Sequence, residues 1–189
     1  MIFAYVDLIK ENLFKPTPAS RCDSKKPVQK WSPPLKGVIC LNSDAALFDA
    51  EGSMGLGVVA RDHRGSLLIS CHQPIQGLLS PEEAEALALQ RAVQLAQEEG
   101  YEKVVFTSDC LSLIQRLKSG VMDSSPAGIL VSGIKEMTTS FTSVSFTHVS
   151  RFLNVAAHIL AKSCISCSSP EVFYSVPDCI RGTICIDMM

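Results

Sequence analysis

The order of strand-like and helix-like segments constrains the fold of this chain more than any other feature of its sequence. Three apolar segments that read as strands come first, between residues 37 and 73, before any long helical pattern. The later segments are a helix over 80–100, a buried strand over 102–109, helices over 110–120 and 126–140, a strand over 141–150 and a helix over 153–164. The order βββαβααβα predicts an α/β fold: a five-stranded mixed sheet, antiparallel on one side and parallel on the other, with helices packed on it.

The helix predicted over residues 80–100 begins with a clear start signal and carries one misplaced charge. Ser80 suits the N-cap, Pro81 suits the first helical position, and Glu83 completes an S-x-x-E capping box. At roughly 100° per residue, the apolar side chains gather into one arc, and Glu85 falls near the middle of that arc. A carboxylate on the buried face of a helix needs a partner, because burying an unpaired charge is costly.

Three other polar residues stand at the ends of predicted strands. Asp44 ends the first strand, Asp109 ends the fourth and His148 ends the fifth. Ligands of open α/β sheets bind beyond the carboxyl ends of the strands, so Asp44 and Asp109 converge if their strands are parallel neighbours. Glu85 would then point at both carboxylates from the facing helix.

Carboxylates gathered in a partly buried place repel one another, and no Lys or Arg is evident in the sequence to neutralise this cluster. A hard divalent cation such as Mg²⁺ would do so, and two such ions form a clamp for phosphodiester cleavage. Each residue also has an ordinary structural interpretation. Asp44 could be a turn residue, Asp109 an N-cap, Glu85 the partner of an arginine at the edge of the core, and His148 a surface residue at a strand end.

Composition limits what else the chain is expected to do. Its 189 residues are 47% hydrophobic, enough for one domain, and the net charge of −2 gives no general attraction to polyanions. No apolar run approaches the ~20 residues of a transmembrane helix, and the N-terminus lacks the pattern of a signal peptide. We therefore expect an intracellular monomer, nuclear or cytoplasmic, with no membrane partner.

The chain divides into three parts by composition. Residues 1–36 are expected to form an N-terminal segment ending in a basic, proline-rich linker, residues 37–164 the folded domain, and residues 165–189 a C-terminal tail. Cys164 and Cys167 form a C-x-x-C motif, but the cysteines after it have the wrong spacing for a zinc ribbon. We expect reduced cysteines and no structural zinc.

Five segments together resemble the type 1 ribonuclease H-like domain, in the version widespread in plant genomes and retrotransposon polyproteins. They are "LNSDAA", "GLGVVARDHRGSLL", "EEAEALALQRAV", "VVFTSDCLSLI" and "HVSRFLNVAAHILAK", and the resemblance covers residues 37–164. It implies that Asp44, Glu85 and Asp109 match three of four acidic metal ligands, and that His148 matches a mobile-loop histidine that helps product or proton departure. The implied reaction is hydrolysis of the RNA strand of an RNA–DNA hybrid, dependent on Mg²⁺ or alternatively Mn²⁺; structured RNA is the alternative partner.

His158 stands where the resemblance places the fourth acid. As an imidazole it is either a metal ligand better suited to softer ions than Mg²⁺ or a helix-face residue without a role, and it supplies no negative charge. Three interpretations therefore stay open: a ribonuclease of RNA–DNA hybrids, a catalytically weakened or inactive nucleic-acid-binding module of the same fold, and a structural or protein-interaction remnant with no nucleic-acid role.

Overall fold

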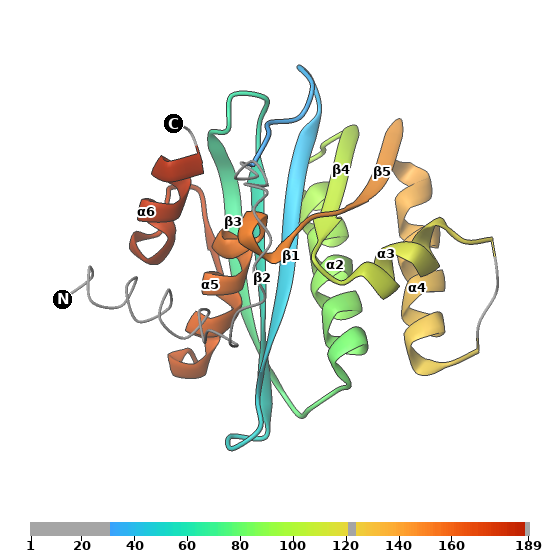
Figure 1. Cartoon of the computed structure of the whole chain (residues 1–189), viewed down its shortest axis with the longest axis vertical. Helices are drawn as coiled ribbons and strands as arrows, with labels where there is room; N and C mark the ends of the chain where they lie inside the picture. The colour runs from blue at the N-terminus through green and yellow to red at the C-terminus, as the bar shows by residue number, and fades with distance from the viewer. Residues whose placement is uncertain (1–30, 121–123, 188–189) are drawn as a thin grey trace, which may run out of the picture.

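A mixed sheet of six strands forms the centre of the protein in the computed structural model, which describes residues 31–120 and 124–187 (Figure 1). The strands are β1 (Ile39–Phe48), β2 (Ser53–Arg61), β3 (Leu67–Gln76), β4 (Lys103–Ser108), β5 (Ser143–His148) and β6 (Glu171–Phe173). Their order across the sheet is β5-β4-β1-β2-β3-β6. The pairs β1–β4 and β4–β5 are parallel, and β1–β2, β2–β3 and β3–β6 are antiparallel. The predicted α/β class and mixed sheet are confirmed.

Five helices lie on the two faces of this sheet in the described residues. They are α2 (Pro81–Glu98), α3 (Leu111–Lys118), α4 (Pro126–Met137), α5 (Val155–Ser163) and α6 (Asp178–Asp187). Strand β2 shows the layering: Val58 packs with residues of α2, α3 and α4, whereas its neighbour Val59 packs with residues of α5 and α6. Successive side chains of a strand point to opposite faces, so β2 is buried on both sides.

Helix α2 has the start that its sequence predicts. The Ser80 hydroxyl accepts a hydrogen bond from the Glu83 backbone N–H at 3.5 Å, and the Glu83 carboxylate accepts one from the Ser80 N–H at 2.8 Å. This reciprocal capping box fixes where the helix begins and therefore which residues of its first turns face the sheet.

Helix α5 lies directly on the backbone of β2 because that strand has glycines where the two meet. A Cβ atom added to Gly57 would overlap the backbone oxygen of Ala157 and lie 2.5 Å from the backbone nitrogen of Ala161. A Cβ atom on Gly55 would overlap the backbone oxygen of Ala161 as well. The close approach brings the side chains of α5 within reach of β1, the next strand of the sheet.

Residues after 164, predicted to form a tail, contribute a strand and a helix. Strand β6 pairs with β3 at the edge of the sheet, and Ile180 and Ile184 of α6 are buried against α5. The five predicted strands omit β6 because a three-residue strand is too short to show alternation. No helix in the described part of the chain is long and apolar enough to cross a membrane.

The predicted N-terminal linker falls mostly on residues 1–30, which lie outside the described residues. The described part opens with Trp31, which is buried, and the guanidinium carbon of Arg61 lies 3.6 Å from the centre of its indole ring. The cysteines of the described ranges, Cys164 and Cys167 among them, are free thiols.

Candidate metal centre

Asp44 lies within β1, not at its end as the sequence suggests. The strand continues to Phe48 because it stays paired with β2, where Asp44 lies opposite Gly57. Pairing with β4 stops earlier, at Asn42 and Thr107. Asp44 therefore lies just beyond the last residue of β1 that pairs with β4. The separation of the two strands leaves space for its side chain on the side facing β4. The interpretation of Asp44 as a turn residue is wrong.

Asp109 and Glu85 reach the same place from two other elements. Asp109 directly follows β4, and the residue that caps α3 is Cys110, so the interpretation of Asp109 as an N-cap is also wrong. Glu85, on the second turn of α2, accepts hydrogen bonds from the Ala45 backbone N–H at 3.3 Å and from the Ser108 hydroxyl at 3.2 Å. These two bonds hold its carboxylate between β1 and β4.

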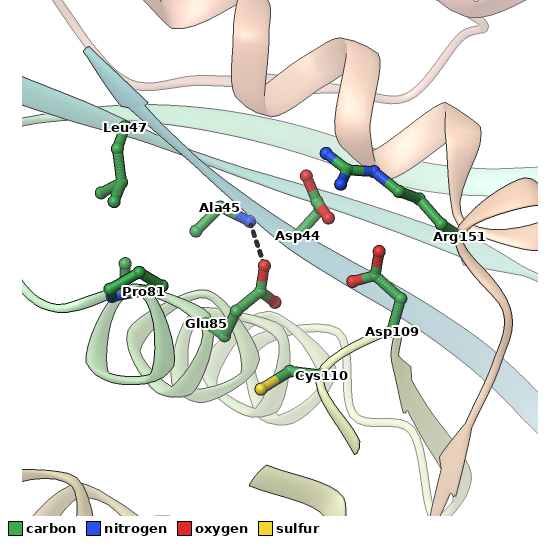
Figure 2. Close-up of a pocket in the computed structure, with 9 residues that line it drawn as sticks. Asp44, Ala45, Leu47, Pro81, Glu85, Asp109, Cys110 and Arg151 are labelled. Carbon is green, nitrogen blue, oxygen red and sulfur yellow. Dashed lines mark hydrogen bonds between the residues drawn. The ribbon is translucent and has the colours of Figure 1, made fainter. Parts of the chain in front are cut away.

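The three carboxylates face one another across a small pocket. One oxygen of each of Asp44, Glu85 and Asp109 lies within 4.8 Å of the others. The pocket has a volume of about 300 Å³, and Figure 2 shows all three carboxylates pointing into the same space. The ligand set consists of oxygen atoms only, which suits Mg²⁺ or Mn²⁺ better than a softer metal ion.

Proximity and burial perturb the ionisation of these acids. Burial, followed by repulsion from Asp44 and Asp109, raises the pKa of Glu85 to about 8. Burial also raises the pKa of Asp44, although its hydrogen bond with His158 opposes the rise. Without a cation, the raised pKa of Glu85 lets it keep a proton that an ordinary carboxyl group has released at neutral pH, so a divalent ion would relieve an electrostatic cost.

The metal-free protein is therefore expected to lose stability as the pH rises from about 5 to about 8. The pKa of Glu85 is about 8 in the folded protein against an ordinary 4.5, so over this interval the folded state keeps a proton that the unfolded chain has released. The free energy of unfolding then falls by up to about 1.4 kcal/mol per pH unit. Urea denaturation in EDTA at several pH values measures the slope. Glu85→Gln should flatten it, and a slope of zero or of opposite sign in the unaltered protein contradicts the assignment.

His148 lies beside the acidic pocket without lining it. It ends β5, is exposed, and its Nε2 lies 3.2 Å from the backbone oxygen of Asp109. The imidazole therefore lies next to the backbone of Asp109, not its carboxylate, and remains accessible to solvent.

His158 contacts Asp44 instead of standing beside all three acids. It lies on α5 and is buried, and its Nδ1 is 2.8 Å from Asp44 Oδ2. Among the described residues, the group close enough to share one ion consists of Asp44, Glu85 and Asp109, without His158. The histidine thus occupies one oxygen of a carboxylate that a metal would also use.

The sequence analysis did not predict that Arg151 is a charged residue of this pocket. It lies on the short 3-10 turn Arg151–Leu153 before α5, lines the pocket, and extends its guanidinium toward Asp44 (Figure 2). Its charge helps to lower the pKa of Asp44. The expectation that no Lys or Arg is available to the cluster is therefore wrong, because a long side chain from a distant turn reaches across the site.

Comparisons with known proteins identify the family and the fold. The family model described as reverse transcriptase-like matches residues 42–164. RNase H1 from the halophilic archaeon Halobacterium salinarum is 23% identical, with 68% of this chain and 97% of that chain covered and a TM-score of 0.63.

Two further solved structures are similar. The N-terminal RNase H domain of a Mycobacterium tuberculosis protein is 18% identical, with 68% of this chain and 93% of that chain covered and a TM-score of 0.61. LC11-RNase H1 from a compost metagenome, crystallised with an RNA/DNA hybrid, is 22% identical, with 66% of this chain and 94% of that chain covered and a TM-score of 0.59. The comparison with curated protein sequences finds no match. At these identities the structural likeness shows a shared fold.

Proposed function

The chain belongs to the reverse transcriptase-like family and has the ribonuclease H-like fold, and from that premise we propose that it hydrolyses the RNA strand of RNA–DNA hybrids in a reaction that depends on Mg²⁺ or Mn²⁺. One observation carries the proposal: Asp44, Glu85 and Asp109 come from three separate elements and place one oxygen each within 4.8 Å of the others. Such a group is costly to assemble unless it binds cations.

The acids have distinct supports for holding divalent ions. Asp44 lies in the paired part of β1, Asp109 directly follows β4, and Glu85 is held by its bonds to Ala45 and Ser108. Bound ions would polarise the phosphodiester and favour ionisation of an attacking water. The protein's own part is to present pre-oriented oxygens in a small pocket, so that little reorganisation accompanies binding.

Two cationic or ionisable side chains would act on the nucleic acid itself. Arg151 lines the pocket and is an exposed residue, so its guanidinium can bind a phosphate oxygen next to the acids. His148 is exposed beside Asp109, a position from which its imidazole would donate a proton to a departing oxygen. The hybrid is the substrate we favour because LC11-RNase H1, similar in fold, was crystallised with an RNA/DNA hybrid.

A second function is supported by His158. Its Nδ1 lies 2.8 Å from Asp44 Oδ2, so it competes with a metal for this carboxylate and adds no negative charge. A protein with a weakened metal site and an intact nucleic-acid-binding surface would bind nucleic acid and cleave it slowly or not at all.

Replacing His158 by aspartate separates the two functions. The variant frees Asp44 Oδ2 and adds a carboxylate, so we expect Mg²⁺-dependent cleavage of a labelled RNA–DNA hybrid to rise at least about tenfold. The assay compares the unaltered protein with His158→Asp in Mg²⁺, in Mn²⁺ and in EDTA. His158→Asn, which removes the imidazole without adding charge, is the matched control.

The outcomes are distinct. Cleavage by the unaltered protein that stops in EDTA supports the nuclease, and a further gain in His158→Asp but not His158→Asn identifies the missing acid as the limit. Measurable hybrid binding with no cleavage by any of the three proteins, in either metal, supports the binding module instead.

A further inference from the structure

A row of buried, hydrogen-bonded polar side chains connects Asp44 of β1 with helix α6. Asn154, the residue before α5, donates its side-chain amide to the backbone oxygen of Ser43 at 2.8 Å and to Asp44 Oδ1 at 3.4 Å. Its own amide oxygen accepts a hydrogen bond from Asn42 Nδ2 at 3.2 Å. Both ends of the Asn154 amide are therefore engaged, which fixes the orientation of the group beside Asp44.

The row continues through a buried cation to the C-terminal helix. Arg61 Nη2 donates to Asn42 Oδ1 at 2.9 Å, and Arg61 Nη1 forms an ion pair with Asp187 Oδ2 of α6 at 2.6 Å. The guanidinium also lies against the Trp31 ring. Arg61, Asn42 and Asn154 are each 1% exposed, so water is not available to replace a lost partner.

Helix capping does not account for Asn154. It is the N-cap of α5, yet its side chain makes no capping hydrogen bond, and the amide is directed to β1 instead. Asn42 makes no hydrogen bond to a helix backbone in the described residues; its amide connects Arg61 to Asn154, and its oxygen also accepts a bond from Cys40 Sγ at 3.8 Å. The shorter hydrogen bonds of both side chains lie on the path between Arg61 and Asp44.

We propose that Asn154, Asn42 and Arg61 are positioning residues that orient the Asp44 carboxylate, and that Asp187 on α6 thereby influences the metal affinity of the acidic pocket. The inference rests on the proposed function, because it assigns metal binding to Asp44. The mechanism is orientation: if Asn42 or Arg61 shifts, the Asn154 amide loses the bond that fixes its oxygen, and its donor to Asp44 Oδ1 is held less firmly.

The test is the affinity for Mn²⁺ and Mg²⁺, measured by calorimetric titration of the full chain without nucleic acid. We expect Asn42→Leu, which removes the bonds to Asn154 and Arg61 at similar volume, to weaken Mn²⁺ binding about tenfold. Asp187→Asn, one step farther away, should weaken it about threefold. Asp187→Glu keeps the carboxylate and should restore binding.

A matched control separates positioning from general destabilisation. Ile134→Ala creates a cavity in α4, on the other side of the sheet from α5 and α6, and should lower the melting temperature while leaving metal affinity unchanged. The proposal is overturned if Asn42→Leu and Asp187→Asn lower the melting temperature but bind Mn²⁺ like Ile134→Ala. Altered affinity without hybrid cleavage would retain this inference and reject the nuclease, whereas cleavage with unaltered affinity would do the reverse. Absence of metal binding in the unaltered protein overturns both.

Discussion

Asp44→Asn is expected to reduce hybrid cleavage at least about 100-fold, more than the loss of a residue that only supports a metal ligand. Asp44 is the central member of the pocket: it faces Glu85 and Asp109, and Arg151 and His158 both act on its carboxylate. Asparagine preserves the shape and one oxygen but removes the negative charge. Initial rates on a labelled hybrid in Mg²⁺ and in Mn²⁺ measure the loss.

A binding measurement accompanies this rate measurement. Divalent ions that bind only the folded protein raise its melting temperature, and Asp44→Asn should remove most of that rise. Asp49→Asn is the matched control, because Asp49 lies in the exposed turn after β1 and outside the pocket, and it should behave like the unaltered protein in both assays. Cleavage that persists in purified Asp44→Asn would show that the activity does not arise from this site.

Gly57→Ala is expected to destabilise the protein by at least about 3 kcal/mol, a large effect for a single methyl group. The added Cβ would overlap the backbone of α5 at Ala157 and Ala161, and backbone atoms cannot move aside as a side chain does by changing rotamer. Helix α5 would have to lift away from β2, which also exposes apolar side chains packed between them. Urea denaturation followed by circular dichroism measures the change.

The same substitution elsewhere provides the control for Gly57→Ala. Gly133 lies in α4 with no atom within 4 Å of an added Cβ, so Gly133→Ala should stabilise the protein, by about 0.5–1 kcal/mol, through helix propensity alone. A Gly57→Ala protein as stable as the unaltered protein would show that α5 does not lie as close to β2 as described.

Local patterns in the sequence were enough to predict the fold class and the inward direction of Glu85. The capping box at Ser80 fixes where α2 begins, and the helical period then determines which way Glu85 points. Both inferences depend only on neighbours along the chain, and for that reason they hold in the structure.

Features that depend on distant neighbours could not be predicted in the same way. Asp44 lies within a strand because β1 continues to pair with β2 beyond the end of its pairing with β4. Arg151 reaches the pocket from a turn more than a hundred residues after Asp44 in the sequence. The hydrogen bond of His158 to Asp44 depends on the glycines that let α5 approach β2. Local periodicity carries no information about such contacts.

The ion pair of Arg61 with Asp187 bears on how this protein should be produced for experiments. A shortened polypeptide ending near residue 164, where the family match ends, would leave the guanidinium of Arg61 inside the protein without its anionic counterpart. It would also uncover the hydrophobic surface now shielded by Ile180 and Ile184. Such a fragment would be prone to aggregate, so recombinant versions should retain the chain from Trp31 through Asp187.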